Sequence, residues 1–91
     1  MIEIVKVVGV EPLEGFRLRV RFSDGLSGVH DFREIVTESG PMVVPLRDEA
    51  FFKRVFIELG VLTWPNGYDL DAINLHREMK AAGELAAAAA E

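Results

Sequence analysis

The sequence predicts an α+β fold: a small mixed or antiparallel sheet of hairpins with two short helices and a C-terminal helix. Pairs of apolar runs flank Asp24-Gly25 and Leu59-Gly60, which is typical of β-hairpins. Aspartates in front of short apolar segments mark the helix starts. A chain of 91 residues makes one domain, which we place at residues 1–80, followed by an alanine-rich helical or frayed tail at 81–91.

The first strand is expected over residues 1–9. Ile4 and Val8 fall on one side of this strand, and Val5 and Val7 fall on the other. Strands with apolar residues on both sides are usually buried on both faces, so we expect a central or doubly covered strand.

Residues 16–22 form the clearest strand, because apolar residues alternate with Arg17, Arg19 and Arg21. One face of this strand is therefore apolar and the other is basic. A two-residue loop at Asp24-Gly25 fixes the register of the hairpin. The predicted opposite pairs are Phe22 with Ser27, Val20 with Val29, Arg19 with His30 and Leu18 with Asp31.

Two short helices are expected in the middle of the chain. Asp31 resembles the first residue of a capping box for a helix at 32–36, and Asp48 is expected to cap a second helix at 49–54. Between them, residues 42–46 are apolar but contain a proline. They predict either a short edge strand or an extended connector.

The stretch 62–71 joins the second hairpin to the last helix and holds the only Trp and the only Tyr. Pro65 ends a strand, and Asn66-Gly67 tolerate the backbone angles of a tight turn. We expect the Trp64 ring to be core. The functional alternative is a binding rim whose members are Trp64, Asn66, Tyr68 and Asp69.

The last helix is expected to begin near Asp71, although Asp69 is also a plausible cap, and Ile73 and Met79 contribute to its apolar spacing. Gly83 interrupts this helix at a cost of about 1 kcal/mol relative to Ala. The following alanines favour helix but bury little surface. We expect an exposed helical extension that frays; the alternative is a helix packed closely on a neighbouring chain.

Composition argues against several classes of protein. Without cysteine the chain has no disulfide and no thiolate metal site. The net charge of −5 argues against general nucleic-acid binding. No signal peptide is visible, and no apolar run approaches the roughly 20 residues that cross a bilayer. We therefore expect a cytoplasmic protein without a membrane association.

Catalysis has little support in the sequence. His30 and His76 have no local nucleophile and carboxylate with which to form a catalytic set. Asp69-Leu70-Asp71 begins like a calcium loop, but the next ligand position is Ile73. Glycine-rich phosphate loops are missing. We expect no enzymatic activity, no metal site and no cofactor.

The arginine stripe is the most specific functional pattern. Arg17, Arg19 and Arg21 are spaced about 7 Å apart along one strand face, where they can hold phosphates or an acidic partner. The alternative is pairing with neighbouring carboxylates such as Glu3 and Asp31, each pair contributing about 0.2–1 kcal/mol.

Several sequence blocks together resemble a known family. The blocks are Phe16-x-Leu18-x-Val20-x-Phe22-x-Asp24-Gly25, Val29-x-Asp31-Phe32, Pro45-Leu46-x-Asp48-x-x-Phe51-Phe52-x-x-Val55 and Trp64-Pro65-Asn66-Gly67-x-Asp69-Leu70. Over residues 4–75 the chain resembles the bacterial family called domain of unknown function 2442. The resemblance implies an α+β fold and no established activity. The resemblance also implies that some relatives accompany toxin–antitoxin or DNA-binding components, but we expect no helix-turn-helix after residue 80 of this sequence.

Two classes of function follow. The first is a non-enzymatic protein-interaction module, antitoxin-like or regulatory, that binds a protein partner or forms a homodimer and does not read DNA directly. The second is a module for a small molecule or nucleotide that uses the rim from Trp64 to Asp69 and the arginine face.

Overall fold

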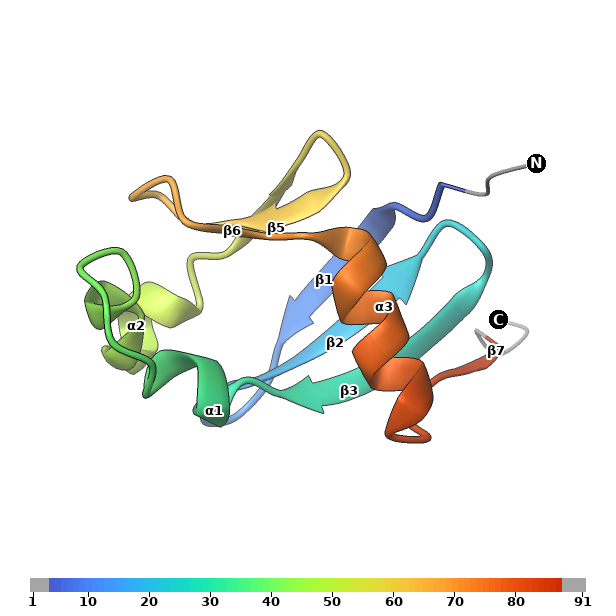
Figure 1. The fold of residues 1–91 in the computed structure, drawn as a ribbon, viewed down its shortest axis with the longest axis horizontal. Helices are drawn as coiled ribbons and strands as arrows, with labels where there is room; N and C mark the ends of the chain where they lie inside the picture. The colour runs from blue at the N-terminus through green and yellow to red at the C-terminus, as the bar shows by residue number, and fades with distance from the viewer. Residues whose placement is uncertain (1–3, 88–91) are drawn as a thin grey trace.

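The computed structural model describes residues 4–87, which fold into two antiparallel sheets with short helices and a C-terminal helix (Figure 1). The predicted α+β class is confirmed. A four-stranded sheet has the order β1-β2-β3-β7, and a three-stranded sheet has the order β4-β5-β6. The orange helix α3 lies over one face of the larger sheet (Figure 1), where the His76 ring is 4.9 Å from the Phe22 ring.

The elements follow one another in a simple order. They are β1 (Val7–Pro12), β2 (Arg17–Phe22), β3 (Leu26–Asp31), α1 (Arg33–Val36), the 3₁₀ helix η1 (Val44–Arg47), α2 (Glu49–Phe52), β4 (Phe56–Glu58), β5 (Val61–Thr63), β6 (Asp69–Leu70), α3 (Ala72–Ala81) and β7 (Ala86–Ala87).

The expected central position of the first strand is wrong. β1 is the end strand of the four-stranded sheet, and it begins at Val7 and continues into the predicted loop. A bulge after Val7 shifts the register, so that Val7 and Val10 both lie opposite core residues of β2 while Val8 is 54% exposed. The apolar residues on the second side of β1 are therefore partly left in solvent.

The predicted register of the first hairpin is wrong by one residue. The loop has three residues rather than two, because the Gly25 N–H donates to the Phe22 carbonyl at 3.1 Å and Gly25 adopts φ +89°. Arg19 therefore lies opposite Val29, and His30 lies opposite Leu18 on the core side of the sheet. This places His30 away from the arginines.

Several smaller expectations need correction. Residues 42–46 form neither strand nor extended connector, because η1 begins at Val44 with its proline in the first turn. Asp69 belongs to β6, a strand that the sequence did not predict, and Asp71 is the cap of α3 through a bond from the Asn74 N–H. Ile73 is 42% exposed, so Ala72, Leu75 and Met79 form the buried side of α3.

The C-terminal segment differs from the predicted tail. Gly83 ends α3 instead of interrupting it: with φ +75° it lets the Glu84 N–H donate to the Met79 carbonyl at 2.9 Å. Ala86 and Ala87 then form β7 beside β3, so this part of the expected helical extension is strand. Residues 88–91 of the predicted tail lie outside the described residues.

The core joins both sheets through aromatic rings. Trp64 has no exposed surface, and its indole N–H donates to the Phe52 carbonyl at 2.8 Å. The Phe52 ring is 5.6 Å from the Trp64 ring, 5.2 Å from Phe16 and 5.9 Å from Phe32. The expectation that Trp64 belongs to the core is confirmed.

Replacing Trp64 tests this packing directly. We expect Trp64→Ala to lower the free energy of unfolding by about 3–5 kcal/mol, because a large cavity opens and the Phe52 carbonyl loses its donor. Phe56→Ala is the control, since Phe56 is 41% exposed, and it should cost less than about 1 kcal/mol. Urea unfolding followed by circular dichroism measures both values; similar losses for the two variants would contradict the core position of Trp64.

Among the glycines of the described residues, Gly28 leaves the least space for a side chain. An added Cβ would overlap the carbonyl oxygen of Glu84, whereas the same atom at Gly9 would lie 3.4 Å from the Arg21 Cβ. Gly28→Ala should therefore cost about 1–3 kcal/mol, because the segment that leads into β7 must move. Gly9→Ala, measured in the same urea titration, should cost clearly less. Equal stabilities of the two variants would show that the Glu84 carbonyl does not lie against Gly28.

Candidate functional site

The predicted alternation along β2 is confirmed. Leu18, Val20 and Phe22 are buried, and the three arginines between them are exposed on the opposite face. Because α3 covers the apolar face, the arginines lie on the open face of the four-stranded sheet. The alternation of a strand explains this placement without any further feature.

A shallow hollow of about 660 Å³ lies on this open face, and we call it the arginine hollow. Small residues form much of its floor, among them Gly9, Ser27 and Ala86. Its full lining is Gly9, Val10, Glu11, Arg19, Arg21, Ser27, Gly28, Glu84, Ala86 and Ala87. β7 thus completes a site to which sequence reasoning assigned only the arginines.

The three arginines differ in their partners. Arg19 Nε lies 3.3 Å from Glu11 Oε1, and Arg17 Nη2 lies 3.8 Å from Glu14 Oε1 outside the hollow. Arg21 makes no ion pair with any residue from 4 to 87. Of the guanidinium groups in the hollow, that of Arg21 is therefore available to a ligand.

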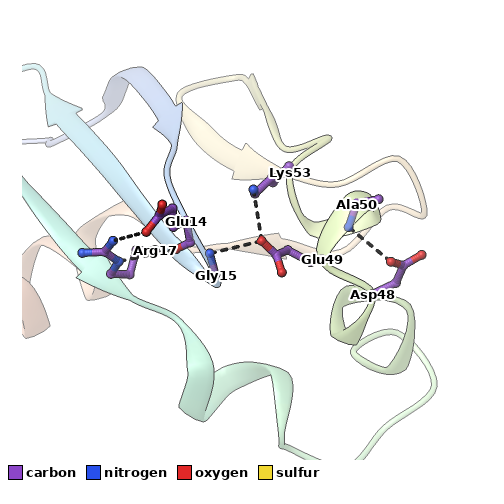
Figure 2. Close-up of polar contacts among 7 residues, drawn as sticks. All are labelled: Glu14, Gly15, Arg17, Asp48, Glu49, Ala50 and Lys53. Atoms are coloured by element: carbon purple, nitrogen blue, oxygen red, sulfur yellow. Dashed lines mark hydrogen bonds and ion pairs between the residues drawn. The ribbon is translucent and has the colours of Figure 1, made fainter.

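Figure 2 shows why Arg17 is the least suitable of the three. Its guanidinium turns toward Glu14 in the loop that joins β1 to β2. The same loop is tied to α2, because the Gly15 N–H donates to Glu49 Oε2 at 3.2 Å. The partners expected for these arginines were Glu3 and Asp31; Glu3 lies outside the described residues, and the Asp31 carboxylate accepts the Arg33 N–H instead.

The predicted binding rim does not form one surface. Trp64 is buried, and Asn66 donates its side-chain amide to the Met42 carbonyl at 2.9 Å while its oxygen accepts the Tyr68 N–H. Asp69 is exposed on β6, and Tyr68 lines a second hollow, which is described below. That hollow shares no lining residue with the arginine hollow. The structure therefore does not bring the rim and the arginine face together.

Both histidines tie the C-terminal part of the chain to the first hairpin. His30 Nδ1 lies 2.7 Å from Glu84 Oε1, and His76 Nε2 lies 2.8 Å from Asp24 Oδ2. A carboxylate only accepts, so each ring donates the hydrogen. Among residues 4–87 no cluster of three or more His, Asp or Glu side chains is arranged to hold a metal ion.

Asp24 is held in its ionised form. Partial burial acts to raise the pKa of its carboxyl, but the Leu26 N–H and the His76 ring both donate to it and lower the pKa overall. The charge on this side chain thus helps to hold the hairpin turn against α3.

The fold and these surfaces define a small α+β domain with an open sheet face. The chain belongs to the family described as protein of unknown function DUF2442, whose model matches residues 7–81. Neither the comparison with curated proteins nor the comparison with solved structures gives a match. No helix in the described part of the chain is long and apolar enough to cross a membrane.

The pH dependence of an asparagine variant tests the Asp24 tie. A carboxyl whose pKa is lowered by folding stabilises the fold above its unfolded pKa of about 3.9, and this contribution disappears as the pH falls through the folded value. Asp24→Asn should therefore be less stable by about 1 kcal/mol at pH 7, and the difference should shrink in acid.

Urea unfolding of both proteins at a series of pH values measures that difference. Asp69→Asn is the matched control, because the Asp69 carboxylate makes no hydrogen bond or ion pair with residues 4–87. Only the backbone of Asp69 takes part in pairing, as a residue of β6. A deficit for Asp24→Asn that stays constant down to the acid limit would contradict the lowered pKa.

Proposed function

We propose that this domain is a non-enzymatic protein-interaction module that binds an acidic, extended segment of a partner in the arginine hollow. The observation that carries the proposal is Arg21, whose guanidinium has no ion pair within residues 4–87 and lies beside Arg19 on the sheet face opposite α3. Guanidinium groups bind carboxylates through two parallel hydrogen bonds, which gives direction as well as strength.

The spacing of the arginines suits an extended partner. Alternate residues of a strand are about 7 Å apart, both on β2 and along one side of a bound peptide. Two acidic side chains of an extended segment at positions i and i+2 therefore match Arg19 and Arg21. The small floor residues Gly9 and Ser27 leave room for the backbone of that segment.

The charge of the chain favours a protein partner over nucleic acid. The hollow is lined by two arginines but also by Glu11 and Glu84, and the whole chain has a net charge of −5. A nucleic-acid surface needs a broader positive footprint. We do not expect direct DNA reading by this chain.

The family supplies the biological setting of the proposal. The resemblance implies that some relatives accompany toxin–antitoxin components, and on this ground we propose that the module is an antitoxin-like or regulatory partner of another protein.

A small anionic ligand is the second candidate. The volume of about 660 Å³ falls within the range of roughly 300–1,000 Å³ that is usual for small-molecule sites. This candidate uses Arg19, Arg21 and the Ser27 hydroxyl, and it does not use Trp64. Thermal-shift measurements with nucleotides and dicarboxylates test it, because a ligand at 100 times its Kd stabilises by about 2.7 kcal/mol.

An arginine comparison tests the main proposal. A fluorescein-labelled peptide in which Glu alternates with Thr is titrated with the protein and followed by anisotropy. Arg21→Ala should weaken binding at least about tenfold, because a hydrogen bond to a charged group contributes about 1.5–3 kcal/mol. Arg17→Ala is the matched control: it removes the same charge from the same strand face, but outside the hollow.

The control should change the Kd by less than about threefold, as expected for an exposed ion pair. Equal losses for the two variants would mean that only net charge matters. Failure of the unchanged protein to bind the peptide would overturn the choice of an acidic extended partner.

A further inference from the structure

A second concave surface lies on another part of the domain. It has a volume of about 200 Å³ and is built by the α1 region, β6 and α3; we call it the Tyr68 groove. Its full lining is Glu34, Ile35, Glu38, Tyr68, Leu70, Asp71, Asn74, Leu75 and Glu78. Apolar atoms of Ile35, Leu70, Leu75 and the Tyr68 ring all belong to the molecule's core or pack against it.

The polar lining of this groove is one-sided in charge. Four carboxylates line it and no Lys or Arg does. Asp71 Oδ2 accepts the Asn74 N–H as the cap of α3, and Glu78 Oε2 accepts the Asn74 side-chain amide at 3.1 Å. The side chains of Glu34 and Glu38 make no hydrogen bond or ion pair with residues 4–87.

Several carboxylates in other parts of the chain have a cationic or imidazole partner. Glu11, Glu14 and Glu49 each pair with a Lys or Arg, and Asp24 and Glu84 each contact a histidine. Glu34 and Glu38 thus have no ion-pair partner among residues 4–87, although the Arg47 guanidinium donates to the Glu38 carbonyl at 2.9 Å. Two unpaired carboxylates beside an apolar floor favour a cationic occupant.

Tyr68 responds to this environment. Its pKa is raised, first because the phenol is partly removed from water and then because Glu38 and Asp69 oppose its negative charge. A phenol is protonated at neutral pH in any case, because its ordinary pKa is about 10, and the raised pKa keeps Tyr68 neutral to still higher pH. Its ring is held in place by Trp64, whose ring lies 5.8 Å away. A cation in the groove would meet a fixed aromatic ring as well as carboxylates.

We propose that the Tyr68 groove binds a Lys or Arg side chain that projects from a basic amphipathic segment of a partner protein. The volume of about 200 Å³ is below the roughly 300–1,000 Å³ of small-molecule sites and suits a single long side chain. The methylene stem of such a side chain packs on the apolar floor, and its charged end reaches Glu38, with Glu34 one helical turn away.

This inference goes beyond the acidic segment proposed for the arginine hollow. The two surfaces have no lining residue in common, and they select ligands of opposite charge. A variant at Arg21 should therefore leave binding at the Tyr68 groove unchanged, and either proposal can fail without the other.

The test uses a fluorescein-labelled helical peptide with Leu and Lys at alternating i, i+3 and i+4 positions. We expect Glu38→Gln to weaken its binding about tenfold, the loss of one charge-assisted contact. Glu58→Gln is the matched control: it makes the same substitution at another exposed glutamate that has no ion pair within residues 4–87. It should change the Kd by less than about twofold.

Amide NMR spectra of the labelled protein locate the peptide. Shifts concentrated at Ile35, Tyr68 and Leu75 support the groove. Equal effects of Glu38→Gln and Glu58→Gln, or shifts spread over the whole surface, would overturn it. If spermidine produced the same shifts with the same affinity, the occupant of the groove would be a small polycation, and the proposed protein segment would be overturned. Self-association that Glu38→Gln abolishes would identify a second copy of the chain as the occupant, and this result would also overturn the proposed partner.

Discussion

The hydrogen bond from the Trp64 indole to the Phe52 carbonyl is the contact on which the fold depends most. It is fully buried, and it connects the end of β5 to the end of α2. An indole N–H without a partner in such a place would cost about 1–3 kcal/mol, so the position of α2 and the orientation of Trp64 must be established together. The bond therefore fixes the smaller sheet relative to the helices.

The aromatic rings extend this connection to both proposed surfaces. On one side of Trp64, Phe52 contacts Phe16, which immediately precedes β2 and its arginines. On the other side, Tyr68 contacts Trp64 and lines the Tyr68 groove. The arginine hollow lies on a strand face, and the Tyr68 groove lies between the α1 region and α3. The same core supports both surfaces. A change in the core should thus disturb both surfaces.

The sequence was informative where a local pattern decides the structure. Alternation predicted which side of β2 carries the arginines, and turn and cap residues predicted the β2–β3 and β4–β5 hairpins and the starts of α2 and α3. Prediction from the sequence failed where one pattern is compatible with several structures. Asp24-Gly25 fits a two-residue or a three-residue loop, and the choice between them moved His30 to the other face. β6 and β7 have two residues each, too short for any periodicity. Sequence patterns did not predict the Tyr68 groove, because its carboxylates come from separate segments of the chain. Taken alone, Glu34 and Glu38 have the spacing of a solvent-exposed helix face.

Hydrogen exchange at the Trp64 indole is the most direct test of the central contact. The indole proton takes part in a bond inside the core, so it can exchange with solvent only when the domain unfolds. The free energy of its exchange should therefore equal the free energy of global unfolding. Two-dimensional NMR in D₂O, with small additions of urea, measures the exchange of this single indole proton. We predict that this proton is protected and that its exchange rate rises with urea as steeply as the rates of the slowest backbone amides. Rapid exchange that is independent of urea would show that the indole is open to water and would contradict the central role of this bond.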